Sequence, residues 1–362
     1  MKKEISAVNV ITYIYNKRYF PESNLFKKKK SSHIIYERSD NNMHNDYGRL
    51  SINVHANNIE VPINNAWVTV TDRDSQKIIE QLRTDSSGNT PIIELPAPPV
   101  DYSLEYSNVK PYAEYNVLIY ADGFKRLKVE GIQIMPSSTS IEIAEMKYRT
   151  DNINLEHHIL INEHVLWGAY PAKIPEEEIK PLPKSYEYMI SQDVVIPEYV
   201  IVHLGTPNNK SAKKVRVAYK DYIKNVACSE IYPTWSAETI RANVIAIISF
   251  TLNRVYTDWY HSKGHDFTIT NSTAFDQAFS CERNIFEEIS VIVDQFFSTY
   301  LKKPDIKQPL FTQYCDGKRV KCAKGMKQWE AKQLGDKGYS ASDILKYYYG
   351  YDTYLKTASM FP

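Results

Sequence analysis

The sequence predicts an α+β protein, and two patterns along the chain carry this prediction. Apolar and polar residues alternate between turn-forming segments over residues 48–146, which is typical of the short strands of a small β-sandwich. Over residues 197–362 the apolar residues recur mainly at helical spacing, with short strands between the helices. We therefore expect a β-sandwich domain and an α+β domain, preceded by a leader at 1–47 and joined by a connector at 147–196.

Composition excludes several classes of protein. The chain has 362 residues, with 44 Lys and Arg against 43 Asp and Glu, so its formal net charge is +1. This balance gives no electrostatic reason to expect a nucleic-acid partner. A hydrophobic content of 43% is that of a globular protein. No apolar run approaches the roughly 18 residues that cross a bilayer, so we expect no transmembrane segment.

The first 47 residues are basic and polar. Lys2 and Lys3 precede an apolar stretch at 6–15, but no small-residue cleavage site follows, so we expect no signal peptide. The four lysines at 27–30 are typical of a solvated segment that a trypsin-like protease would cut. We therefore interpret this region as a leader or a detachable pro-segment.

Short strands are expected in the β-sandwich region because apolar residues there occupy every second position. These positions include Leu50, Ile52, Val54, Val68, Val70, Tyr115, Val117, Ile119, Ile132 and Ile134. The sequences DSSG (85–88), DG (122–123) and PSS (136–138) lie between the runs and favour turns.

The connector is rich in proline, which indicates a semi-rigid link. Its prolines include Pro171, Pro175, Pro181 and Pro183. Three histidines lie in the same stretch, namely His157, His158 and His164. They have no partnering carboxylate pattern, so we interpret them as surface residues rather than metal ligands.

The α+β region is expected to contain one early strand and four helices. The strand is predicted at 200–204, and the helices at 219–229, 236–260, 284–301 and from 340 or 342 to 349. Ser236 has the side chain of a helix N-cap. Gly350 follows the last helix, where a glycine commonly ends helical structure.

The four cysteines match no zinc-finger spacing. Six residues separate Cys315 from Cys322, a spacing that could close a small disulfide loop in an oxidising compartment. Cys228 and Cys281 resemble small buried apolar residues. We expect neither a metal site nor a cofactor, and nucleotide-binding and zinc-protease motifs are absent from the sequence.

Glu230 is the residue with the clearest chemical implication. It follows Val226 by four residues on the predicted helix 219–229, which puts its carboxylate on an otherwise apolar face. Apolar surroundings and the C-terminal end of a helix would both raise its pKa. A neutral carboxylic acid can protonate a glycosidic oxygen, so a catalytic acid is one interpretation. The other is a buried glutamate paired with a base such as Arg241.

Polar and aromatic loop residues could line a saccharide groove around such an acid. Ser272 and Asp276 lie in the segment NSTAFDQ (271–277), and Tyr314 begins the segment YCDG. Gln328 and Tyr339 follow in later loops. We predict these five residues to contact substrate, although turn or packing roles are open for each.

Several ordered segments resemble known families. Residues 66–70 (AWVTV), 84–88 (TDSSG), 115–117 (YNV) and 122–124 (DGF) resemble transthyretin-like and carboxypeptidase-regulatory-like domains. The segments KDYIKNVACSEIYPTW (220–235), IRAN (240–243), TNSTAFD (270–276), QYCDG (313–317), QW (328–329), GY (338–339) and ILKYYYG (344–350) resemble the SpoIID-like lytic transglycosylases. Clostridial spore cortex-lytic enzymes of that type also carry a similar β-domain, with segments like LPAPP (95–99) and DYSL (101–104).

The resemblance implies cleavage of the MurNAc–GlcNAc bond of spore-cortex peptidoglycan with formation of 1,6-anhydro-muramyl ends. Glu230 matches the essential acid/base of the family, and the sugar's own C6 hydroxyl would be the nucleophile. It further implies glycan strands as the partner, a germination role in the spore or outside the cell, and activation of a precursor by a germination protease. Some relatives hold zinc near the positions of His261, His265 and Cys281, but the match is partial and we expect no metal here.

Two alternatives stay open. One is a non-catalytic wall-binding paralogue, because Glu330 stands where the family has glycine and would crowd a position with little room. The other is a hydrolytic muramidase, which would need a water-activating base such as Asp276.

Overall fold

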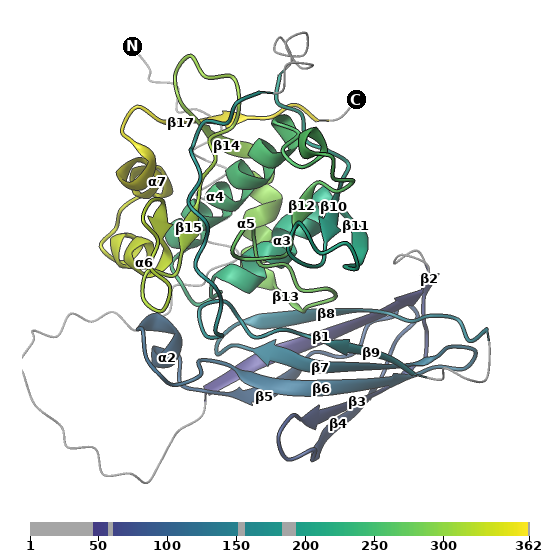
Figure 1. Cartoon of the computed structure of the whole chain (residues 1–362). Coiled ribbons are helices and arrows are strands. Elements are labelled where there is room, and N and C mark those ends of the chain that lie inside the picture. Colours follow the sequence, from purple (N-terminus) through teal and green to yellow (C-terminus); the bar gives the residue numbers. More distant parts are fainter. Residues whose placement is uncertain (1–45, 57–60, 151–155, 183–192, 361–362) are drawn as a thin grey trace, which may run out of the picture. The chain divides into compact units, whose positions relative to one another are not determined.

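The computed structural model describes residues 46–56, 61–150, 156–182 and 193–360, and it has a mixed α+β architecture with several sheets (Figure 1). Most of the predicted leader, including the lysine run at 27–30, lies outside the described residues. No helix in the described part of the chain is long and apolar enough to cross a membrane.

Two five-stranded sheets are built mainly from the first part of the described chain, and β13 comes from further along it. The first has the order β13-β8-β1-β2, with β5 also paired to β1, and the second has the order β4-β3-β6-β7-β9. Strands of the first are β1 (Asp46–Ala56), β2 (Val61–Pro62), β5 (Ile93–Ala97), β8 (Thr139–Glu145) and β13 (Ile285–Phe286). Strands of the second are β3 (Trp67–Asp72), β4 (Ile78–Arg83), β6 (Ala113–Tyr120), β7 (Arg126–Ile134) and β9 (Glu156–Leu160). The short helix α2 (Asp101–Leu104) follows β5.

A single apolar core joins these two sheets. Leu50 and Ile52 of β1 belong to the same buried cluster as Val117 and Ile119 of β6, and none of the four is accessible to solvent. Each pair is spaced by two residues, so one face of each strand points into the core. The alternating pattern of the sequence therefore predicted both the strands and their buried faces.

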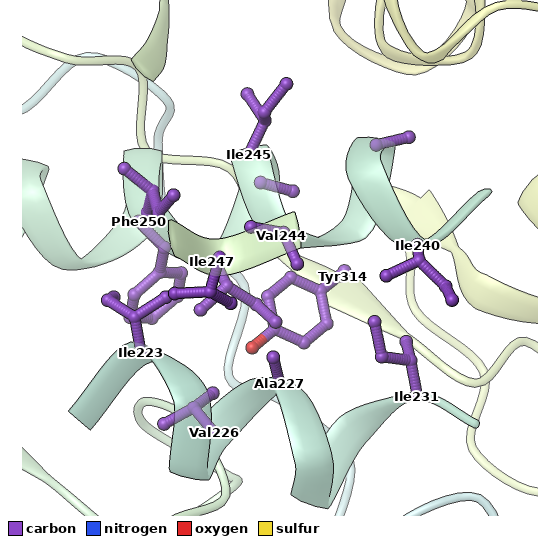
Figure 2. Packing of buried hydrophobic residues seen from close by; sticks show 14 of the residues in the cluster. Ile223, Val226, Ala227, Ile231, Ile240, Val244, Ile245, Ile247, Phe250 and Tyr314 are labelled. Carbon is purple, nitrogen blue, oxygen red and sulfur yellow. The ribbon is translucent and has the colours of Figure 1, made fainter. Parts of the chain in front are cut away.

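A second apolar core surrounds the helix α4 (Ala237–Tyr256). Figure 2 shows the ring of Tyr314 between this helix and α3 (Tyr219–Glu230). Val226 and Ala227 of α3 and Val244 of α4 are inaccessible to solvent there. Because α4 is apolar on nearly every side, the remaining elements of this part pack around it.

Shorter elements complete the α+β part. The helices are α5 (Glu287–Phe296), α6 (Gln328–Asp336), α7 (Ala341–Tyr349) and the 3-10 turn η2 (His261–Lys263). One small sheet has the order β11-β10-β12, formed by β10 (Tyr199–His203), β11 (Lys214–Ala218) and β12 (Ile269–Thr270). Two further pairs are β14 (Thr299–Lys302) with β17 (Tyr354–Thr357) and β15 (Tyr314–Cys315) with β16 (Met326–Lys327).

The helix ends follow the predicted capping residues. The Ser236 side chain accepts a hydrogen bond from the Thr239 N–H group and so begins α4, as the sequence predicted. Gly350 ends α7 with a φ angle of 110°, a positive value that glycine adopts readily because it has no Cβ atom. The helix predicted over 236–260 ends earlier, at Tyr256.

The helix predicted over 284–301 is wrong at both ends. Only Glu287–Phe296 is helical. Ile285 and Phe286 pair instead with Ile141 and Ser140 of β8, and residues 299–302 form β14. Pairing with strands distant in the sequence, β8 at the first end and β17 at the second, decides these ends, and local periodicity does not contain that information.

Residues of the predicted connector are built into the fold. Its first part, β9, runs parallel to β7. The following stretch, residues 163–180, is named the strap here. It is hydrogen-bonded to residues 308–313, for example from the Phe311 N–H group to the Glu178 carbonyl oxygen at 2.9 Å. The interpretation of His164 as a surface residue is wrong, because it is fully buried and its Nε2 lies 3.2 Å from the carbonyl oxygen of Ile231.

Candidate active site

Glu230 is the last residue of α3, and only 2% of it is exposed to solvent. Ile223 and Val226 precede it by seven and four residues, so one face of the helix carries all three side chains inward. Ile231 then adopts an extended conformation, which ends the helix. The local sequence thus places an acidic side chain in apolar surroundings at a helix C-terminus.

Three donors hold the carboxyl group of Glu230. Its Oε1 accepts hydrogen bonds from the Ala278 N–H group at 3.0 Å and from the Tyr314 hydroxyl at 3.3 Å. Gln328 Nε2 donates to the Glu230 backbone carbonyl oxygen at 2.9 Å and lies 3.5 Å from Oε2. Oε1 has two donors and Oε2 has only the long contact with Gln328, so Oε2 is the better place for the proton of the neutral carboxyl group.

Burial raises the pKa of Glu230 above its ordinary value. The positive charge of Lys173 and the hydrogen bonds just described oppose this shift without reversing it. Burial also lowers the pKa of Lys173, against the opposing influence of the negative charge on Glu230. A carboxyl group with a raised pKa keeps its proton to higher pH, so Glu230 is suited to general-acid chemistry.

Glu230 lines a small pocket of about 20 Å³, which has room for about one water molecule. The other lining residues come from the strap, from the loop after β12, and from β15 and the loop after it. They are Val165, Tyr170, Pro171 and Lys173, then Thr273, and then Tyr314, Cys315, Asp316 and Val320. A ligand that reaches Glu230 would therefore pass between the strap and the loop after β15.

Lys173 crosses this pocket from the strap. Its ammonium group donates hydrogen bonds to the carbonyl oxygens of Thr273, at 3.3 Å, and of Asp276. It also lies 4.9 Å from the centre of the Tyr314 ring. A positive charge is thus fixed beside the ring whose hydroxyl contacts Glu230.

The loop after β15 is closed by a disulfide between Cys315 and Cys322, the pair whose spacing made such a loop possible. Inside the loop, the Asp316 carboxylate accepts hydrogen bonds from the N–H groups of Lys318, Arg319 and Val320. These contacts and the disulfide give one wall of the pocket a defined shape. Of the other two cysteines, Cys228 is buried and Cys281 is half-buried.

The predicted substrate contacts fall into two groups. Tyr314 and Gln328 both contact Glu230. Ser272 lies half-buried in the loop next to the pocket residue Thr273, and its N–H group bonds Thr270 Oγ1 at 3.3 Å. Tyr339 is 47% exposed and is not one of the pocket-lining residues. The structure therefore brings two of these four side chains to Glu230.

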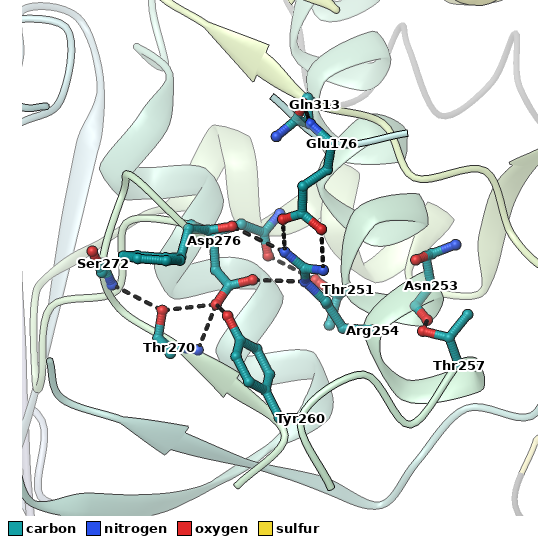
Figure 3. Close-up of polar contacts among 12 residues, drawn as sticks. Glu176, Thr251, Asn253, Arg254, Thr257, Tyr260, Thr270, Ser272, Asp276 and Gln313 are labelled. Atoms are coloured by element: carbon teal, nitrogen blue, oxygen red, sulfur yellow. Dashed lines mark hydrogen bonds and ion pairs between the residues drawn. The ribbon is translucent and has the colours of Figure 1, made fainter. Parts of the chain in front are cut away.

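Asp276 is fully buried in a charged network of its own (Figure 3). Oδ1 pairs with Arg254 Nε at 2.8 Å, and Oδ2 accepts from the hydroxyls of Tyr260, at 2.5 Å, and Thr270, at 2.7 Å. Arg254 in turn makes a two-pronged ion pair with Glu176, at 2.6 and 3.0 Å. Both oxygens of Asp276 are occupied, so this geometry assigns it to the network rather than to substrate.

Two expectations about charged residues are corrected by the structure. Arg241 pairs with Glu238 in the first turn of α4, and its partner is not Glu230. Glu330 does not crowd its surroundings, because its side chain is 41% exposed and lies 3.2 Å from Lys327. Within the described residues no three or more His, Cys, Asp or Glu side chains gather as metal ligands, and His261 instead pairs with Asp258.

Sequence reasoning missed the contribution of the strap. Tyr170 and Lys173 lie in a stretch that was interpreted only as a link. The sequence holds one weak signal, because Lys173 is the only charged residue in the otherwise apolar segment PAKIP (171–175). Its position in the pocket depends on pairing with residues about one hundred positions later, which no local pattern reveals.

Comparison with known proteins adds little. No protein-family model and no curated protein matches the chain. Solved structures with local similarity include the Bacillus anthracis TIE protein (18% identity, 29% of this chain, 16% of that chain, TM-score 0.21). Another is GBS52, the minor pilin of Streptococcus agalactiae (14% identity, 30% of this chain, 47% of that chain, TM-score 0.21). A third is catechol 1,2-dioxygenase from Pseudomonas arvilla C-1 (10% identity, 33% of this chain, 57% of that chain, TM-score 0.23). The chain covers less than two thirds of each, and such TM-scores carry no argument about function.

Proposed function

We propose that this protein is a peptidoglycan lytic transglycosylase that cleaves the MurNAc–GlcNAc bond with Glu230 as general acid and base. The observation that carries the proposal is a buried, protonatable Glu230 that opens into a pocket. The other carboxylate lining that pocket, Asp316, already accepts three N–H hydrogen bonds. With no second free carboxylate in the pocket to activate water, an internal nucleophile is favoured, and the C6 hydroxyl of muramic acid would supply it.

The proposed reaction balances with Glu230 alone. Glu230 Oε2 donates its proton to the glycosidic oxygen as the bond from that oxygen to C1 of muramic acid breaks. The C6 hydroxyl of the same sugar attacks C1, and its proton passes to the Glu230 carboxylate. A 1,6-anhydro-muramyl end and a free GlcNAc 4-hydroxyl result, and Glu230 is protonated again for the next cycle.

The neighbours of Glu230 suit both halves of this cycle. Burial favours the neutral acid that begins the reaction. Lys173 favours the carboxylate that exists between the two proton transfers, because its positive charge acts on the same group. The Ala278 N–H group and the Tyr314 hydroxyl fix Oε1, which leaves Oε2 for proton transfer.

The finer assignments belong to the same proposal. The two five-stranded sheets would form a transthyretin-like or carboxypeptidase-regulatory-like sandwich, and the part around α4 a SpoIID-like catalytic domain. Substrate would be the glycan strands of spore cortex, met at germination in the spore or outside the cell. An activating protease would remove the basic leader.

Mass spectrometry of muropeptides released from purified cortex peptidoglycan tests the reaction. We expect anhydro-ended fragments from the native protein and none from Glu230→Gln. Glu330→Gln is the matched control, because Glu330 is an exposed glutamate, and it should keep full activity. Fragments one water heavier would instead indicate a hydrolytic muramidase. Binding to cortex sacculi without any released fragment would indicate a wall-binding paralogue.

A further inference from the structure

A second and larger hollow is also lined in part by the strap. Its volume is about 440 Å³, which is within the size range of ligand sites. We name it the Trp259 groove. Its lining residues are Ile174, Glu176, Glu177, Lys180, Pro181, Pro207, Trp259, Tyr260, Lys263, His265 and Phe275.

Charges in and beneath the Trp259 groove leave one cation without a carboxylate partner. Ion pairs join Glu176 to Arg254 and Lys180, Asp276 to Arg254, and Glu177 to Lys324. These three acids and three bases balance. Lys263 also lines the groove, and within the described part of the chain no carboxylate lies within ion-pairing distance of it.

The ammonium group of Lys263 is nevertheless held in a defined place. It lies 3.0 Å from the centre of the Trp259 ring, as a cation over an aromatic face. Lys180 and Arg254 each lie 4.8 Å from the same ring centre, so three positive charges surround Trp259. A groove with aromatic walls and one unneutralised ammonium group is suited to an anionic ligand with apolar or ring-shaped parts.

The groove and the Glu230 pocket share a wall. Along the strap, Lys173 lines the pocket and its neighbour Ile174 lines the groove. Along the loop after β12, Thr273 lines the pocket and Phe275 the groove. The Ile174 N–H group bonds the Ala274 carbonyl oxygen at 2.7 Å and holds the two segments together. A chain-like ligand bound in one hollow would therefore have to cross only this shared wall to reach the other hollow.

We infer that the Trp259 groove binds a carboxylate-bearing saccharide, with Lys263 pairing to the carboxylate and the aromatic side chains contacting the sugar. This inference rests on the proposed function, under which muramic acid and its lactyl carboxylate are the relevant chemistry. It assigns the groove a role in holding substrate, separate from the proton transfers at Glu230.

Isothermal titration calorimetry with two disaccharides that differ in charge tests the inference. GlcNAc–MurNAc carries one carboxylate and chitobiose carries none, and the Glu230→Gln background prevents turnover. We expect GlcNAc–MurNAc to bind more tightly than chitobiose. Adding Lys263→Met should weaken GlcNAc–MurNAc by about tenfold, the value of one charged hydrogen bond, and leave chitobiose unchanged. Lys263→Arg should restore the preference.

Lys210→Met is the matched control, since Lys210 is an exposed lysine outside the groove, and it should change neither affinity. Equal binding of the two disaccharides, absence of binding, or a preference that survives Lys263→Met would overturn the inference. The proposed function fails separately, through the absence of anhydro fragments from the native protein. Loss of the preference in Lys263→Met together with no anhydro fragments would leave a saccharide-binding groove on a protein that is not a transglycosylase.

Discussion

Lys173 and Glu230 lie in one pocket and shift each other's proton affinity in opposite senses. Burial raises the pKa of Glu230 while the charge of Lys173 lowers it, and burial lowers the pKa of Lys173 while the charge of Glu230 raises it. The residues are 57 positions apart in the chain, by subtraction of their numbers. Their proximity depends on the path of the strap, and the chemistry of the acid therefore depends on a segment outside the helical part.

Replacing Lys173 should move the pH dependence of cleavage. In Lys173→Met the opposing positive charge is gone, so the pKa of Glu230 rises further. Because the protonated acid begins the reaction, activity is lost as pH rises through that pKa. The basic limb of the kcat/KM profile should consequently move to higher pH. Lys224→Met, which removes a lysine paired with Asp294, should leave the limb in place. A downward shift in Lys173→Met would contradict the electrostatic link.

The gain in folding stability from Glu230→Gln, relative to wild type, should grow as pH increases. The folded protein holds the Glu230 proton more tightly than the unfolded chain, in which the pKa of a glutamate is about 4.3. Wild-type stability from this group is therefore full below that value and declines as pH rises toward the folded pKa. Glutamine does not ionise, so the Tm difference between variant and wild type should grow from about pH 4 upward. Glu330→Gln should show no such trend, and a difference that shrinks with pH would contradict the raised pKa.

Asp276→Asn should lower the free energy of unfolding, and it should not abolish cleavage by the folded protein. The substitution removes a charge from a buried pair with Arg254, and breaking buried pairs costs about 3–5 kcal/mol. Urea unfolding measures this loss, with the exposed Asp294→Asn as a control expected to stay within about 1 kcal/mol of wild type. Normal stability with loss of all cleavage would instead point to Asp276 as a base and favour hydrolysis.

Removing the disulfide should loosen the loop after β15. Cross-links over short loops contribute about 2–3 kcal/mol, so the double variant Cys315→Ser with Cys322→Ser should unfold at lower urea concentration. Cleavage should also fall, since Cys315 and Val320 form part of the pocket wall. Cys281→Ser removes an unbonded cysteine and is the control. Unchanged unfolding and activity in the double variant would show that the wall keeps its shape without the bond.

Local sequence patterns were sufficient for much of the fold. Helical spacing located α3 and α4, and the hydroxyl of Ser236 marked where α4 begins. Alternation located β1 and β6 because each strand has one buried face. The same reasoning failed at β13 and β9, whose states depend on pairing with distant strands. Edge pairing of this kind leaves no period in the strand's own sequence.

The candidate site was predictable in the same uneven way. Glu230 was found because its helix gives every fourth residue a common direction. Tyr314 and Gln328 were predicted to contact substrate, and the structure places both against Glu230. Asp276 was proposed on the same grounds, but an arginine from α4 and a tyrosine hydroxyl occupy its oxygens. Residue type alone does not distinguish a ligand-binding carboxylate from one that holds its own loop.

The strap also limits how short a working piece of the protein can be. A fragment beginning at residue 197, where the composition changes, would lack Tyr170 and Lys173 and with them one side of the pocket. It would also expose the carbonyl oxygen of Ser229, which now accepts a hydrogen bond from the Val165 N–H group at 3.1 Å. Inheritance and recombination of this module would therefore have to carry the strap with the helices, and also β8, because β8 pairs with β13.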